Sequence, residues 1–235
     1  MEENMSIKNL IFDLDDTLLD FKGGEVADIK ELFATHCHLE GPALEKALAT
    51  YQGINSRLWY QYEMKEIDRE EIFTSRFPKT LAALGLTEQA DAKQLEEDYA
   101  YLRDHNYRML DGAKELLETL SKRYMLFAGT NGQEETQYRR LKATGLLPYF
   151  TKVYTSEGLG VAKPDASFFE KIFSAEAAVQ KEETIMIGDG LYSDILGGQN
   201  AQMATIWVNL KHKELPTDIH PSKQVHSLNE LAEIL

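Results

Sequence analysis

The chain has 235 residues, of which 43% are hydrophobic and 27% charged, and its formal net charge is −14 at pH 7. This composition supports a buried core, while the acidic balance argues against a nucleic-acid polymer or an anionic membrane surface as partner. The single cysteine, Cys37, excludes an intramolecular disulfide and is typical of a reducing compartment. No stretch approaches the roughly 18 apolar residues that span a bilayer. The opening MEENM lacks the basic and apolar regions of a secretory signal, so we expect a cytoplasmic protein.

Short apolar runs predict the buried strands of a parallel sheet. The first run, residues 10–12, lies near the N-terminus, and the others follow residue 110 and alternate with helical patterns. These later runs are residues 124–128, 153–155, 184–187 and 205–208. Strand and helix in alternation predict an α/β fold with a Rossmann-like parallel sheet.

Residues 21–106 differ from this pattern. They are rich in Glu, Gln, Lys, Ala, Leu and Tyr and contain no β-branched runs, which favours several helices. The simplest arrangement is therefore a sheet domain, residues 1–20 and 107–235, with a helical insertion after its first strand.

Polar side chains lie near the ends of these predicted elements. Taken singly, each polar side chain has an ordinary explanation: the acids, the threonine and the asparagine suit turns or helix caps, and the lysine suits an exposed surface. Because the carboxyl ends of parallel strands meet at one edge of a sheet, we expect them to lie close together. They are Asp13 and Asp15 after the first strand, Thr130 and Asn131 after the second, Lys163 before the next helix, and Asp189 and Asp194 after residues 184–187. The turn after the first strand, DLDDT, is not the G-x-G-x-x-G of a dinucleotide-binding protein.

This set resembles the four motifs of the haloacid dehalogenase-like hydrolases: D-x-D-x-T, a Ser or Thr, a Lys, and G-D-x-x-x-x-D. The matching residues are Asp13, Asp15 and Thr17; Thr130; Lys163; and Gly188, Asp189 and Asp194. The resemblance covers the whole chain, because the family places a helical cap where residues 21–106 lie. One departure is Gly129, where the family usually has an apolar residue, and we expect this glycine to loosen the strand end.

The resemblance implies a phosphatase that forms an aspartyl-phosphate. Asp13 would attack phosphorus, and Asp15 would protonate the leaving oxygen and later accept a proton from water. Mg²⁺ would be bound by the carboxylates of Asp13 and Asp189 and the backbone carbonyl of Asp15, with Asp194 orienting these ligands. The residues expected to hold the phosphate are Thr130, Asn131 and Lys163.

The same resemblance separates activities within the family. Its haloacid dehalogenases lack the acid at the position of Asp15, because a halide leaves without protonation, so the sequence favours a phosphatase. Sugar-phosphate phosphatases and phosphomutases keep both acids and stay open as alternatives. A non-catalytic phosphoryl-binding protein is a third interpretation.

A closer resemblance concerns the substrate. Residues 58–62, 161–164 and 193–201 are similar to the bacterial pyrimidine 5′-nucleotidases of this family. This implies a small phosphorylated metabolite as partner, namely a nucleoside monophosphate, with non-canonical pyrimidine nucleotides among the candidates. For the assembly we expect a monomer or homodimer. In the insertion, Arg57, Trp59 and Tyr62 are candidates for substrate recognition, whereas aromatic residues at helical spacing also favour simple packing.

Overall fold

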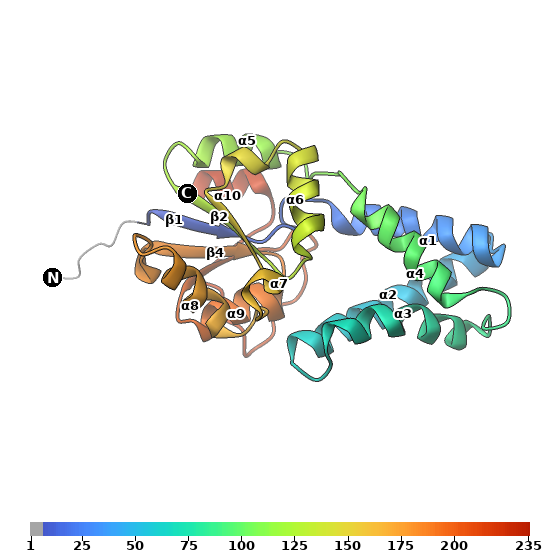
Figure 1. Ribbon diagram of the computed structural model, residues 1–235. Helices are drawn as coiled ribbons and strands as arrows, with labels where there is room; N and C mark the ends of the chain where they lie inside the picture. Colours follow the sequence, from blue (N-terminus) through green and yellow to red (C-terminus); the bar gives the residue numbers. More distant parts are fainter. Residues whose placement is uncertain (1–6) are drawn as a thin grey trace. The chain divides into compact units, whose positions relative to one another are not determined.

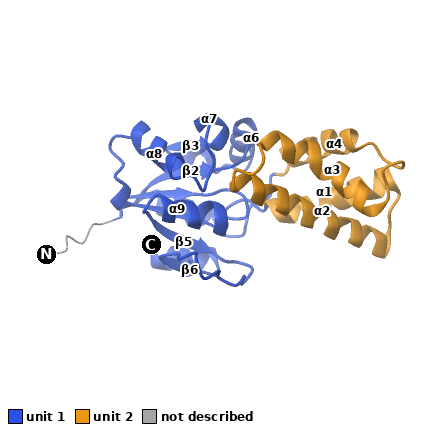
Figure 2. Ribbon diagram, turned by 90° about the horizontal axis from the view of Figure 1, so that it is seen from below, with its two compact units in different colours: residues 1–20, 107–235 blue, residues 21–106 orange. Residues whose placement is uncertain are grey.

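The computed structural model describes residues 7–235, so the interpretation of the opening MEENM lies outside the described residues. The chain divides into two compact units (Figure 2). Residues 1–20 and 107–235 form the sheet unit, and residues 21–106 form the helical unit. Within the described part of the chain, none of the helices combines the length and apolar character needed to cross a membrane.

The sheet unit is built on six strands in the order β3-β2-β1-β4-β5-β6, and every neighbouring pair is parallel (Figure 1). The predicted α/β fold with a parallel sheet is therefore confirmed. The strand β2 runs on through Gly129, which pairs with Tyr154, so the expectation that this glycine loosens the strand end is wrong. The strands are β1(Asn9–Phe12), β2(Met125–Thr130), β3(Lys152–Thr155), β4(Thr184–Gly188), β5(Ala204–Val208) and β6(Lys223–Val225).

Helices cover both faces of this sheet, and β1 shows why. Its side chains alternate, so Leu10 and Phe12 pack in one apolar core with α5 and α10, while Ile11 packs in a second core with α8. Figure 1 shows α5 and α10 on one side of the sheet and α8 on the other. Burial on both faces explains why the strands are continuous apolar runs. The helices are α5(Ala113–Leu120), α6(Glu134–Ala143), α7(Ser156–Leu159), α8(Ala166–Ala175), α9(Leu196–Asn200) and α10(Leu228–Ile234), with short turns η1(Leu147–Tyr149), η2(Lys181–Glu183) and η3(Leu191–Ile195).

The helical unit contains α1(Phe21–Cys37), α2(Gly41–Glu63), α3(Arg69–Leu84) and α4(Ala92–Asp104). Local signals explain their ends: the Asp68 carboxylate accepts from the backbone N–H of Glu71 at the start of α3, and Gly85 ends that helix with φ 71°. The unit has its own apolar core, which includes Phe33, Phe77 and the buried Cys37.

Candidate active site

Asp13 directly follows the central strand β1. Its backbone N–H donates to the carbonyl oxygen of Ile187 in β4 at 2.8 Å, which fixes it at the carboxyl edge of the sheet. The chain then turns sharply, with Asp16 at φ 62°. Thr17 points back: its Oγ1 lies 3.4 Å from Oδ2 of Asp13 and accepts from the backbone N–H of Asp189 at 3.0 Å. Thr17 thus joins the ends of β1 and β4.

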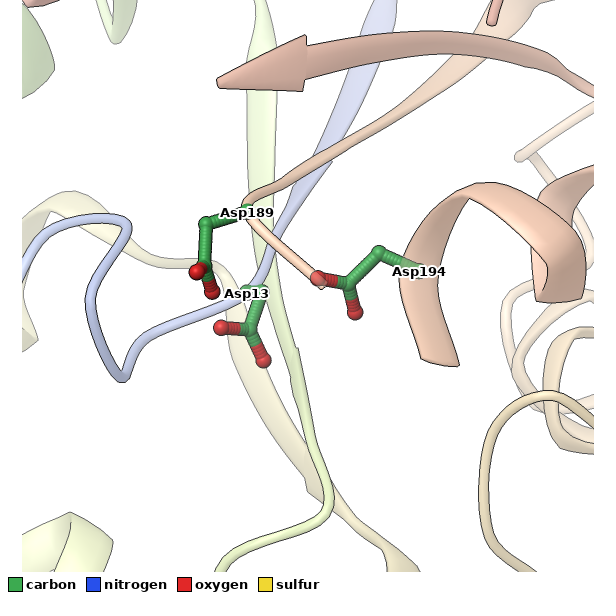
Figure 3. A group of neighbouring side chains, drawn as sticks. All are labelled: Asp13, Asp189 and Asp194. Atoms are coloured by element: carbon green, nitrogen blue, oxygen red, sulfur yellow. The ribbon is translucent and has the colours of Figure 1, made fainter. Parts of the chain in front are cut away.

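Three carboxyl groups converge at this edge (Figure 3). Asp13, Asp189 and Asp194 each offer an oxygen atom, and these oxygens all lie within 4.8 Å of one another. Asp189 follows β4, and Asp194 comes from the π-helical turn η3, a geometry found frequently at functional sites. A Cβ atom at Gly188 would lie 2.1 Å from Oδ2 of Asp194, so the absence of a side chain at this position lets Asp194 reach the cluster.

The ammonium group of Lys163 lies against two of these acids. Its Nζ atom donates to Oδ1 of Asp13 at 2.8 Å, to Oδ1 of Asp194 at 2.6 Å, and to the carbonyl oxygen of Gly129 at 2.6 Å. The side chain is completely buried. Burial acts to lower the pKa of Lys163, but the charges of Asp13 and Asp194 outweigh it and raise that pKa above the ordinary value. The contacts with Asp13 and Asp194 therefore favour the charged form of Lys163.

The carboxylates outnumber this cation. Burial raises the pKa of Asp13 well above its usual range, and the neighbouring charge of Asp194 raises it further. Burial also raises the pKa of Asp194, against the opposing effect of Lys163. Three carboxyl groups beside two ammonium groups, those of Lys163 and of Lys213 near Asp189, retain negative charge. Carboxylate oxygens are the ligands that Mg²⁺ prefers. The donor set therefore fits a hard divalent cation.

The turn after β2 holds the loop that carries Lys163. Asn131 spans to that loop: its Nδ2 donates to the Lys163 carbonyl oxygen, and its Oδ1 accepts from the Lys163 N–H, both at 2.9 Å. Thr130 is buried, and its Oγ1 accepts from the Gly132 N–H at 3.0 Å and from Nε2 of Gln137 at 3.2 Å. The side-chain amide of Asn131 thus positions the backbone of Lys163. Thr130 lies at the carboxyl end of β2, at the same edge of the sheet as Asp13.

Sequence reasoning missed three residues at this edge. Arg140 and Gln137 on α6 both donate to the carboxylate of Asp15, and Nζ of Lys213 lies 3.5 Å from Oδ2 of Asp189. One signal was available for the first two, because Gln137 and Arg140 are spaced three apart and share one helix face. The sequence offers no comparable signal for Lys213, which reaches the edge from the long segment after β5.

Arg57, Trp59 and Tyr62 all belong to α2 in the helical unit. The Trp59 ring meets the rings of Tyr62 and Phe73 edge to face, with centroids 5.9 and 6.3 Å apart. Arg57 is exposed. These contacts favour the packing interpretation for Trp59 and Tyr62.

The sequence pattern of the family described as haloacid dehalogenase-like hydrolase matches residues 10–208. Pyrimidine 5′-nucleotidase PynA of Streptococcus pneumoniae is 40% identical over 98% of this chain and 96% of its own length. Pyrimidine 5′-nucleotidase YjjG of Escherichia coli is 30% identical over 96% of each chain.

A solved structure is similar along nearly the whole chain. The crystal structure of the HAD-hydrolase YfnB from Bacillus subtilis, bound to magnesium, has a TM-score of 0.89 and 34% sequence identity. The match covers 98% of this chain and 99% of that one.

Proposed function

Because this chain belongs to the haloacid dehalogenase-like hydrolase family, we propose that it is a Mg²⁺-dependent phosphomonoesterase acting on nucleoside monophosphates. The observation that carries the proposal is the position of Lys163, whose buried ammonium contacts Asp13 within a cluster of three acids. A carboxylate that attacks a phosphate dianion meets like-charge repulsion, and buried positive charge beside both groups reduces it.

Asp13 is the nucleophile in this proposal. One of its carboxylate oxygens attacks phosphorus, the bond to the leaving oxygen breaks, and that oxygen takes both the electron pair and a proton from Asp15. Water then attacks phosphorus and gives its proton to Asp15, while the bond to Asp13 breaks and its electron pair returns to that carboxylate. Each residue is thereby restored for the next cycle.

The remaining residues bind and orient the phosphoryl group. The hydroxyl of Thr130 and the backbone N–H of Asn131 hold the oxygens of this group. Lys163 compensates the negative charge of the phosphoryl group and of Asp13. Asp13, Asp189 and the backbone carbonyl of Asp15 hold Mg²⁺, which when bound supplies further positive charge at the phosphoryl oxygens. Asp194 orients the ligands of Mg²⁺ and does not bind the ion itself, because its two oxygens already accept from Lys163 and from the Gly190 N–H.

A pyrimidine nucleoside monophosphate is the substrate that we propose first. It rests on the names of PynA and YjjG, which cover almost all of this chain. Within this proposal the helical unit acts as the cap that selects the substrate. Trp59 and Tyr62 support the fold of that cap, since their rings pack on each other, and Arg57 is the exposed residue available for recognition.

A substrate panel tests this function directly. Phosphate release is measured from dUMP, dTMP, UMP and p-nitrophenyl phosphate, beside glycerol and hexose phosphates, with Mg²⁺ or with EDTA. We expect Mg²⁺-dependent release that is fastest with the pyrimidine nucleotides. Faster turnover of sugar phosphates would show that a sugar phosphate, and not a nucleotide, is the substrate. If none of these compounds releases phosphate in a metal-dependent way, the proposed phosphatase activity is wrong.

A further inference from the structure

The acid Asp15 takes its orientation from a helix far away in the sequence. Its side chain is 29% exposed, yet both carboxylate oxygens are engaged by buried donors on α6. Oδ1 accepts from Nη1 of Arg140, and Oδ2 accepts from Nε2 of Gln137 at 2.7 Å. Arg140 and Gln137 are each only 1% exposed. A partly exposed carboxylate thus accepts hydrogen bonds from two buried side chains.

The amide of Gln137 has a defined orientation because all of its contacts agree. Its Oε1 accepts from Nη1 of Arg140 at 3.2 Å, which leaves Nε2 to donate to both Asp15 and the Thr130 hydroxyl. The same amide therefore contacts the acid after β1 and the hydroxyl at the end of β2. A change at Gln137 should be felt at both.

The backbone leaves room for this arrangement. A Cβ atom built on Gly132 would lie 2.1 Å from Nε2 of Gln137 and 2.7 Å from its Cγ. Real Cβ atoms do not approach so closely, so Gln137 can occupy this position because residue 132 has no side chain. The turn after β2 is shaped around the amide.

We propose that Arg140 and Gln137 are positioning residues that hold the Asp15 carboxylate beside the nucleophile. This inference rests on the proposed phosphatase function, since it assigns a support to the group that transfers the proton. A misplacement of about 1 Å in such a group can cost 10²-fold in rate. Because the two donors sit on one face of α6, which also contacts Thr130, proton transfer and phosphate binding share a single support.

The test compares two leaving groups. Deoxyuridine leaves dUMP as an alkoxide that needs a proton, whereas p-nitrophenolate leaves without one. For Arg140→Met we expect kcat/KM with dUMP, which reports the transfer of the phosphoryl group to Asp13, to fall about 10²-fold, and kcat/KM with p-nitrophenyl phosphate to fall much less. Arg140→Lys, which keeps a cation near Asp15, should recover part of the loss with dUMP.

Asp15→Asn provides the second arm. If Arg140 acts through Asp15, adding Arg140→Met to Asp15→Asn should lower kcat/KM with dUMP by no more than about twofold further. The matched control is Arg139→Met, which removes the neighbouring arginine whose partner is Glu135 on the helix surface and should leave kcat/KM unchanged.

Folding is checked by thermal unfolding, and if Arg140→Met does not fold, Gln137→Leu decides by the same ratio of the two substrates. Equal losses of kcat/KM with both substrates, a full additional loss in the Asp15→Asn background, or an unchanged kcat/KM with dUMP would overturn the positioning role alone. A wild-type enzyme that turns over neither substrate would instead overturn the proposed function, and this inference with it.

Discussion

The Nζ atom of Lys163 lies 2.8 Å from Oδ1 of Asp13, although 150 positions of sequence separate the two residues. The same ammonium contacts Asp194, so a single cation serves two buried acids. Charge compensation at this edge is incomplete, because the three carboxyl groups of the cluster face two ammonium groups, those of Lys163 and Lys213. The arrangement suits a site that must accept a divalent cation and an anion together, and several consequences can be measured.

Asp13→Asn should abolish phosphate release and stabilise the metal-free protein at neutral pH. Burial and Asp194 raise the pKa of Asp13 in the folded state, so the ionised carboxylate opposes folding. Between the unfolded and folded pKa values the folded chain binds more protons, and wild-type stability therefore falls as pH rises through that window. Urea unfolding in EDTA at a series of pH values measures this.

The stability difference between Asp13→Asn and wild type should be largest above the folded pKa of Asp13 and should shrink as the pH falls through that pKa. A variant less stable than wild type at neutral pH would contradict the raised pKa of Asp13 in the folded protein.

Lys163→Met should destabilise the protein by about 3–5 kcal/mol, because it leaves buried carboxylates without their cation. Adding Asp194→Asn should restore part of this stability by removing one of those charges. Lys171→Met is the control, since Lys171 lies on the exposed side of α8, and it should change the free energy of unfolding by less than about 0.5 kcal/mol. Equal effects of the two lysine variants would show that the Lys163 contacts carry no stability.

Mg²⁺ should raise the free energy of unfolding by about 2.7 kcal/mol at one hundred times its Kd, and EDTA should remove this gain. Asp189→Asn should lose most of the stabilisation by Mg²⁺, since it deletes a carboxylate of the cluster. The exposed Asp218→Asn serves as control. Thermal unfolding with and without Mg²⁺ measures binding independently of turnover, and an unchanged response in Asp189→Asn would exclude this residue as a ligand.

Gly129→Ala should destabilise the sheet unit by about 1–3 kcal/mol through overpacking. A Cβ atom there would lie 2.8 Å from Cγ2 of Ile11, and the Gly129 carbonyl also accepts from Lys163. Gly53→Ala in α2, where nothing lies within 4 Å of the added atom, should instead stabilise the protein by about 0.5–1 kcal/mol. Chemical unfolding measures the free energy of unfolding of both variants. A change of the same sign in the two would contradict the close packing around β2.

The sheet edge illustrates what the sequence can predict. The sequence predicts that Asp13, Asp189 and Lys163 lie together, because parallel strands bring their carboxyl ends to one edge, and the structure brings them together. Local patterns in the sequence were enough for this prediction, since apolar runs define the strands and the polar residues directly follow them.

The support of the site was harder to predict. Gln137 and Arg140 belong to a strongly polar helix, and their burial depends on where α6 packs against Asp15, which no local pattern specifies. The two hydrogen bonds between the Asn131 side chain and the Lys163 backbone likewise depend on two loops that are distant in sequence. Long-range contacts between polar side chains leave little trace in composition or periodicity.

Trapping the covalent intermediate tests the central claim most directly. The protein is mixed with dUMP and Mg²⁺, quenched during turnover and reduced with borohydride, which converts an aspartyl-phosphate into homoserine, and its peptides are analysed by mass spectrometry. We predict homoserine at position 13, dependent on substrate and absent from Asp13→Asn. Steady phosphate release with an unmodified Asp13, or with the modification at another acid, would contradict the account.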